Sequence, residues 1–100
     1  MRVYVSSPSP AISPQILAYA EYRLFAVLAR YAGVRGARVL LEDHGAGGVR
    51  CSITIDFESA ASARARATGP HAGESIDRAA QRVARLMRRR FQPEIVAVSN

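Results

Sequence analysis

Residues 51–58 read CSITIDFE, and their side chains alternate between apolar and polar types along the whole stretch. Cys51, Ile53, Ile55 and Phe57 share one face, and the polar residues between them share the other. A period of two is typical of a strand that is buried on one face only. This segment therefore predicts a sheet that is covered on one side, and the rest of the chain is interpreted outward from it.

Two more strands are predicted beside this segment, and one is predicted near the start of the chain. Residues 37–43, ARVLLED, alternate in the same way, and the Gly-rich turn 44–48 joins them to residues 51–58. Residues 63–68, ARARAT, alternate as well, although alanine is a weak strand former. Because short turns connect these consecutive segments, we expect them to form an antiparallel meander. Residues 3–5, VYV, predict a short opening strand.

Two amphipathic helices complete the predicted elements. The first begins at residues 13–14, Ser-Pro, a pair that suits a helix N-terminus, and its apolar residues recur at helical spacing as far as Tyr31. Gly33 is expected to end this helix. The second helix follows residues 69–70, Gly-Pro, and continues to about Phe91.

The elements predict an α+β fold of order β-α-β-β-β-α. Each helix has one apolar stripe, so both are expected to pack on the same face of a four-stranded sheet. With 100 residues and 49% hydrophobic content, the chain has material for one core. We expect a single domain over residues 1–91 and a short C-terminal tail over residues 92–100.

Positive charge is concentrated on the second helix. The chain has 14 Lys+Arg, all of them arginine, against 8 Asp+Glu, a net charge of +6. Between Ser75 and Phe91 there are six arginines and a single acid, Asp77. At about 100° per residue, four of these arginines fall within a sector of roughly 60°, and the apolar residues lie opposite them. The four are Arg78, Arg82, Arg85 and Arg89.

A row of like charges favours a polyanionic partner over simple solvation. A solubilising helix face usually mixes both signs, because like charges at i, i+4 spacing destabilise a helix by a few tenths of a kcal/mol per pair. The row, together with Arg88, is therefore a candidate nucleic-acid-binding site. Arg23 and Arg30 of the first helix are further candidates. The neighbouring Tyr19 and Tyr22 could stack on unpaired bases, or they could cover the helix surface or an oligomer contact.

Other chemistry has little support in the sequence. Arg64 and Arg66 are expected on the open sheet face, where we expect them to form cross-strand ion pairs with Asp56 and Glu58. Cys51 is expected in the core. The single cysteine and two histidines have no metal-ligand spacing, and no Gly-rich phosphate loop is present. The sequence predicts no enzyme, no metal, no cofactor and no small-molecule substrate.

Five segments together resemble the ribosome hibernation-promoting factor and ribosome-associated inhibitor A (factor Y) family. They read EYRL at 21–24, LARY at 28–31, ARVLLED at 37–43, GGVRCSI at 47–53 and SIDRAAQR at 75–82. The similarity covers roughly residues 1–91, and the ordered set carries it rather than any single motif. The length corresponds to the short form of the family.

The resemblance implies a domain akin to double-stranded-RNA-binding domains that lodges in the small ribosomal subunit. Its members contact ribosomal RNA in the decoding channel through basic helix surfaces and so inhibit translation. On this chain the matching positions are the arginine row with Arg23 and Arg30. We expect a cytoplasmic protein, since neither a signal segment nor a membrane-spanning stretch is visible, and a monomer in solution.

Two other functions remain open at this point. One is a general domain for structured RNA that acts away from the ribosome. The other is a protein-interaction or dimerisation module whose arginine face only keeps it soluble.

Overall fold

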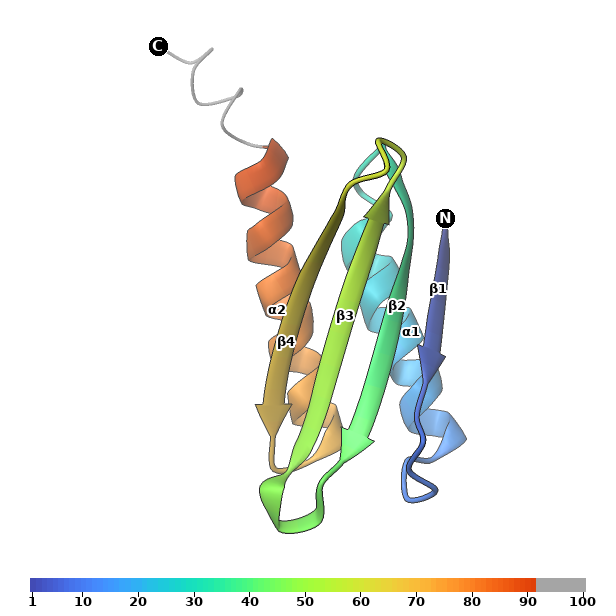
Figure 1. The fold of residues 1–100 in the computed structure, drawn as a ribbon, viewed down its shortest axis with the longest axis vertical. Coiled ribbons are helices and arrows are strands. Elements are labelled where there is room, and N and C mark those ends of the chain that lie inside the picture. Colours follow the sequence, from blue (N-terminus) through green and yellow to red (C-terminus); the bar gives the residue numbers. More distant parts are fainter. Residues whose placement is uncertain (92–100) are drawn as a thin grey trace.

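The computed structural model describes residues 1–91. The elements are β1 (Arg2–Ser6), α1 (Pro14–Leu28), β2 (Val34–Asp43), the 3-10 turn η1 (Gly45–Gly47), β3 (Val49–Phe57), β4 (Ser62–Gly69) and α2 (Ala72–Phe91) (Figure 1). The predicted β-α-β-β-β-α order is confirmed. The predicted tail, residues 92–100, lies outside the described residues.

The strands form one sheet in the order β1-β2-β3-β4. The predicted meander is confirmed for β2, β3 and β4, which pair antiparallel. The opening strand β1 pairs parallel with β2, because α1 carries the chain back along the sheet before β2 begins. A parallel pair of strands needs such a crossover connection.

Both helices cover the same face of the sheet, as predicted, and the other face is open (Figure 1). On β3 the residues at odd positions from Val49 to Phe57 are buried, and those between them are only half-buried. The core therefore lies between the sheet and the helices. Its largest fully buried side chains include Leu24 and Leu28 of α1, Leu41 of β2 and Met87 of α2.

The predicted first helix is three residues too long. Its start is confirmed, because the hydroxyl of Ser13 accepts a hydrogen bond from the backbone N–H of Ile16 at 3.3 Å. Its end lies at Leu28 rather than Tyr31, because the N–H of Tyr31 bonds to the carbonyl of Leu28 in a tight final turn. Gly33 then adopts a positive φ of 87°, which glycine accommodates at no steric cost.

Strand β2 begins at Val34, three residues before the predicted start. Val34 pairs with Phe57, and the ladder then contains an irregularity before Gly36. Gly36 faces Arg2 of β1, and a Cβ atom built there would lie 2.5 Å from the Arg2 carbonyl oxygen. Glycine is therefore required for β1 to approach β2 this closely.

Cys51 lies in the core, as predicted, with none of its surface exposed. Burial raises the pKa of its thiol from 9.0 to about 12. Since the thiolate is the reactive form, Cys51 should react with a thiol reagent at pH 8 only when the domain unfolds. We expect the labelling rate in native buffer to be far below the rate in denaturant. Labelling at the full rate in native buffer would contradict this placement.

Candidate nucleic-acid interface

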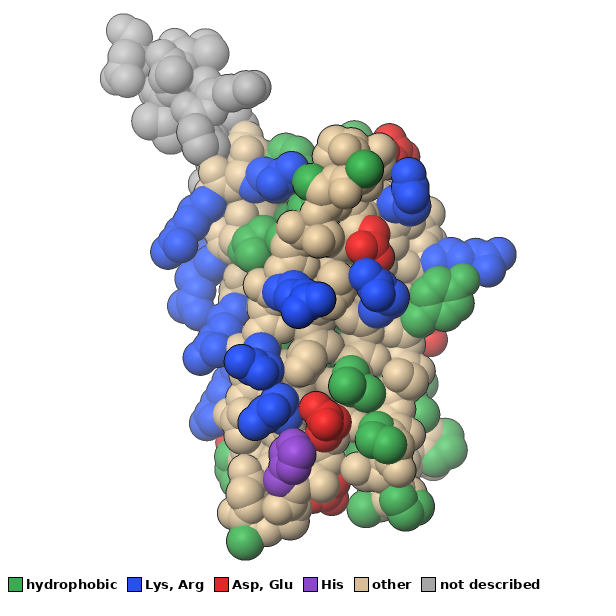
Figure 2. Space-filling view, in the orientation of Figure 1, with side chains coloured by type: hydrophobic (Ala, Val, Ile, Leu, Met, Phe, Trp, Pro, Cys, Tyr) green, Lys and Arg blue, Asp and Glu red, His purple; other side chains and the backbone are tan. Residues whose placement is uncertain are grey.

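Helix α2 has a buried side and an arginine-covered side. Ile76, Ala80, Val83 and Met87 have almost no exposed surface. The predicted arginine row lies on the opposite side and is exposed along its whole length. Figure 2 shows arginine side chains gathered along the margin of the molecule where α2 lies beside β4. The helix thus presents a continuous cationic surface on a rigid support.

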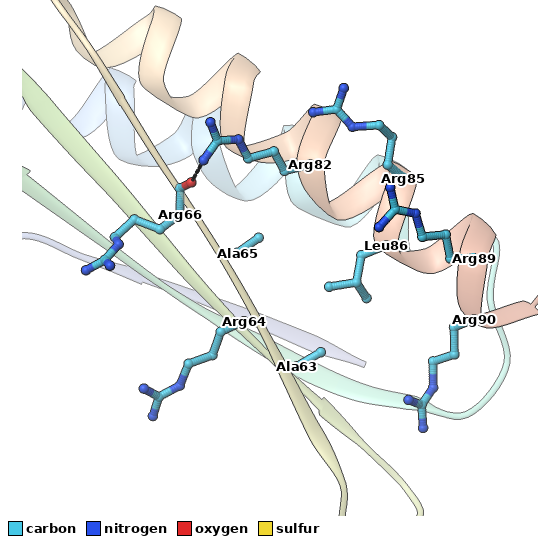
Figure 3. A pocket seen from close by; sticks show the side chains of 9 residues that line it. All are labelled: Ala63, Arg64, Ala65, Arg66, Arg82, Arg85, Leu86, Arg89 and Arg90. Atoms are coloured by element: carbon cyan, nitrogen blue, oxygen red, sulfur yellow. Dashed lines mark hydrogen bonds between the residues drawn. The ribbon is translucent and has the colours of Figure 1, made fainter.

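A shallow groove of about 860 Å³ runs between this margin and the edge strand β4. Its floor is apolar and consists of Ala63, Ala65 and Leu86 (Figure 3). The small alanines of β4 point toward α2 and leave this space open. Six of the nine lining residues are arginines and none is acidic: Arg64, Arg66, Arg82, Arg85, Arg89 and Arg90.

Two members of the row are held against β4. Arg82 donates a hydrogen bond to the backbone carbonyl of Arg66 (Figure 3). Arg78 donates to the carbonyl of Thr68 at 2.9 Å and lies 3.6 Å from the carboxylate of Glu74. The predicted row is therefore not uniform. Arg78 and Arg82 are hydrogen-bonded to the backbone of β4, whereas Arg85 and Arg89 extend from α2 beside the groove.

The predicted pairing of Arg64 and Arg66 with Asp56 and Glu58 is wrong. Asp56 is bound instead by Arg38 of β2, through two hydrogen bonds of 3.0 and 3.1 Å. In the register of β3 and β4, Arg64 faces Thr54 and Arg66 faces Ser52, so neither arginine has an acid directly opposite. Both residues border the groove, but their side chains point away from α2 (Figure 3).

The other candidate arginines lie in a separate crevice between the two helices. Arg23 of α1 and Arg30 of the turn that follows α1 line it together with Arg88 of α2. Because Arg88 lies here, it is not part of the surface formed by the Arg78–Arg89 row. The structure thus divides the predicted site residues between two surfaces.

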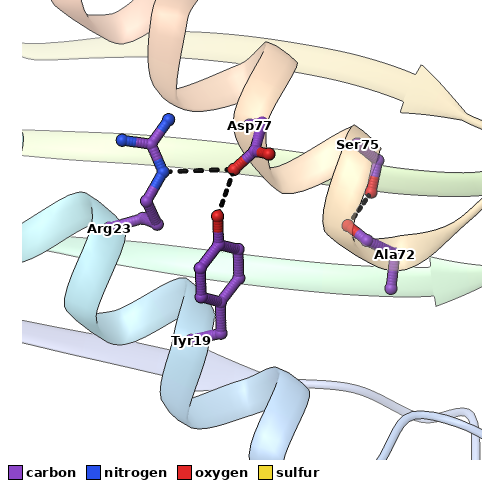
Figure 4. Close-up of polar contacts among 5 residues, drawn as sticks. All are labelled: Tyr19, Arg23, Ala72, Ser75 and Asp77. Carbon is purple, nitrogen blue, oxygen red and sulfur yellow. Dashed lines mark hydrogen bonds and ion pairs between the residues drawn. The ribbon is translucent and has the colours of Figure 1, made fainter.

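Arg23 is already engaged in a polar contact between the helices. Its Nε lies 3.1 Å from Oδ1 of Asp77, and the hydroxyl of Tyr19 donates to the same oxygen at 2.5 Å (Figure 4). Both members of the ion pair are partly exposed, so the pair contributes little to stability. Its effect is to fix the Arg23 side chain. Tyr22, in contrast, is 70% exposed.

The contact between Tyr19 and Asp77 can be tested by titration. The hydrogen bond to the Asp77 carboxylate raises the pKa of the Tyr19 phenol above its ordinary value. Asp77→Asn should lower that pKa, because an amide stabilises the phenol less than a carboxylate does. The measurement is the phenolate absorbance as a function of pH, with Tyr19→Phe to identify the Tyr19 component among the four tyrosines. An unchanged titration in Asp77→Asn would argue against the bond.

Three groove residues were outside the predicted interface. Arg90 comes from the last turn of α2, and its guanidinium lies 4.2 Å from the ring centre of Phe57. Arg64 and Arg66 come from β4, where the alternation with alanine is the signal that could have placed them. It shows that the arginines and the alanines point to opposite sides, but not that β4 lies at the sheet edge beside α2.

Within residues 1–91 the structure contains no cluster of side chains suited to hold a metal ion. None of the helices in the same part of the chain is long and apolar enough to cross a membrane.

Comparison with known proteins agrees with this description. Residues 5–92 match the model of the family described as sigma 54 modulation protein / S30EA ribosomal protein. The chain belongs to this family. The match covers most of the chain, so the family resemblance noted in its sequence is confirmed, and the protein is a member of a ribosome-associated family.

Solved structures also share the fold of this S30EA family member. A ribosomal subunit interface protein from Coxiella burnetii has a TM-score of 0.74 at 10% identity, covering 86% of this chain and 92% of the other. The N-terminal domain of Thermus thermophilus Protein Y has a TM-score of 0.70 at 24% identity, covering 88% and 93%. No curated protein gives a significant match. The predicted α+β fold is thus found in proteins of distant sequence.

Proposed function

We propose that this protein is a non-catalytic factor that binds ribosomal RNA in the decoding channel of the small ribosomal subunit and inhibits translation. The observation that carries the proposal is the groove between α2 and β4, in which six arginines and no acid line the walls. Family membership supplies the ribosome as the partner.

The arginines suit phosphate binding for a geometric reason. A guanidinium is planar and presents paired N–H donors that match two phosphate oxygens, and it stays charged at any physiological pH. Arg85 and Arg89 would bind phosphates and displace the counterions condensed around the RNA. Contacts of this kind position a protein without reading sequence, so specificity comes from the shape of the RNA and of the cleft.

Inhibition then requires no chemical step. A folded body that occupies the decoding channel excludes messenger RNA and the anticodon ends of tRNA from it. The helices and sheet form one core, so the domain enters as a rigid unit. Translation stops because the substrates cannot bind, and resumes when the factor leaves.

The experiment is co-sedimentation of the purified protein with small ribosomal subunits across a salt series. Binding should weaken steeply as salt rises, by about 0.7 to 0.9 in log affinity per log unit of salt for each phosphate contacted. It should also be blocked when messenger RNA and tRNA fill the channel beforehand. Equal binding to filled and empty subunits would contradict the decoding channel as the binding site. Failure to bind at low salt would contradict the proposal as a whole.

A further inference from the structure

The open face of the sheet has a second surface with features of a binding site. Two shallow hollows, of about 460 and 340 Å³, lie side by side on it and share Ser52 and Thr54 of the central strand β3. Tyr4 and Leu40 line the first hollow, and Arg64 and Arg66 line the second. Figure 2 views this face, on which arginine, acidic and apolar side chains are interspersed with uncharged surface.

The strand register explains the hollows. Tyr4 pairs with Arg38, which pairs with Thr54, which in turn pairs with Arg64. These residues form a row that crosses all four strands, a span of about 14 Å at the usual strand spacing. The small side chain of Thr54 lies between the larger Arg38 and Arg64. In the next row Ser52 lies between Leu40 and Arg66 in the same way.

Several residues of this row and of the next have a chemistry that suits nucleic acid, whereas Arg38 is already bound to Asp56. The Tyr4 ring is 58% exposed, and its hydroxyl accepts a hydrogen bond from Arg2 at 3.1 Å, which restrains the ring on the sheet. Ser52 and Thr54 can donate and accept hydrogen bonds at base edges. Arg64 and Arg66 face these hydroxyls rather than acids, so their charge is available to a phosphate.

We propose that the open sheet face binds an unpaired segment of RNA, with a base stacked on Tyr4 and the backbone phosphates on Arg64 and Arg66. A β-sheet with an exposed aromatic ring is a common surface for binding single-stranded nucleic acid, because every base has a face that can stack on the ring. Duplex RNA does not expose its base faces, so it is a poorer match for the ring. The positive charge favours RNA over a neutral protein surface.

The two surfaces meet at β4. Arg64 and Arg66 line both the sheet hollow and the groove beside α2. A strand that leaves the sheet face at these residues therefore enters the groove directly. The inference rests on the proposed RNA partner, but it adds a surface that the decoding-channel proposal does not use.

The test measures the affinity of the whole protein for a fluorescein-labelled oligouridylate and for a duplex RNA of equal length. Tyr4→Val keeps a good strand former but removes the ring, and should weaken single-strand binding about tenfold. Tyr4→Phe keeps the ring and should bind as the wild type does. Phe25→Ala is the matched control, because it removes an exposed aromatic ring from α1 that has no place on the sheet face.

NMR titration with the same oligouridylate should shift the amide signals of Tyr4, Ser52 and Thr54. Unchanged affinity in Tyr4→Val, or shifts confined to Arg85 and Arg89, would overturn the inference and leave the proposed function intact. No binding of oligouridylate would also overturn it, whereas subunit co-sedimentation decides the proposed function separately. Shifts of Tyr4 and Leu40 on dilution without RNA would show a self-association surface instead.

Discussion

The double replacement Arg85→Glu and Arg89→Glu is expected to weaken binding to small ribosomal subunits by at least about a hundredfold, since hydrogen bonds to charged groups contribute about 1.5–3 kcal/mol each. Both side chains line the groove beside β4, and both are exposed. Reversal of their charge replaces two attractive contacts with repulsion of the RNA backbone. Co-sedimentation at low salt measures the loss.

The choice of these two arginines follows from their contacts. Arg82 bonds to the carbonyl of Arg66, so its replacement would also alter the packing of α2 against β4. A loss of binding in Arg82→Glu would therefore have two explanations. Arg85 and Arg89 line the same groove. Their replacement therefore tests the groove without breaking the hydrogen bond that joins Arg82 to β4.

Two controls make the result specific. Arg35→Glu changes an exposed arginine of β2 that does not line the groove, and should leave binding nearly unchanged. Arg85→Gln and Arg89→Gln together remove charge without adding repulsion, and should lower the salt dependence by about two phosphate contacts. Wild-type binding by the double glutamate variant would contradict the groove as the RNA site. An equal loss of subunit binding in Arg35→Glu would show that binding depends on net charge alone.

The largest expected effect on stability comes from Leu24→Ala. Leu24 lies on the inner face of α1 with none of its surface exposed. Truncation of a buried leucine removes its transfer free energy and leaves a cavity, at a cost of about 2–5 kcal/mol in the free energy of unfolding. Each kcal/mol lowers the Tm of a domain of this size by roughly 4–8 °C, so we expect a fall of at least about 8 °C.

The neighbouring residue provides a matched control. Phe25 belongs to the same turn of α1, but 49% of its surface is exposed. Phe25→Ala removes a larger side chain and should cost less than about 1 kcal/mol, because the site is open to solvent. Thermal unfolding followed by circular dichroism measures both variants. A smaller effect for Leu24→Ala than for Phe25→Ala would contradict the described core.

The predictable parts of the fold are those in which local pattern and tertiary environment agree. The alternation at residues 51–58 gave β3, because one face of that strand is buried and the other is not. The start of β2 was missed, since Val34, Arg35 and Gly36 have no strand pattern of their own. Pairing with Phe57 of β3 and the approach of β1 hold them extended.

The site was predictable only in part for a similar reason. Helical geometry places Arg85 and Arg89 on one exposed face from the sequence alone. The position of Arg88 in a different crevice, and the participation of Arg64 and Arg66, depend on how β4 and α1 lie against α2. Likewise the partner of Asp56 was not evident, because β2 and β4 both flank β3 and only the structure shows which arginine binds it.

The hydrogen bonds from α2 to β4 have a consequence for aggregation. An edge strand presents unpaired backbone groups that can template the addition of a strand from another molecule. At Arg66 and Thr68 the outward carbonyls of β4 already accept hydrogen bonds from Arg82 and Arg78. These carbonyls are therefore withheld from an incoming strand, and any chain that approached would also meet a line of positive charge identical to its own. The helix that carries the proposed RNA-binding arginines thus also protects the protein against polymerisation along this edge.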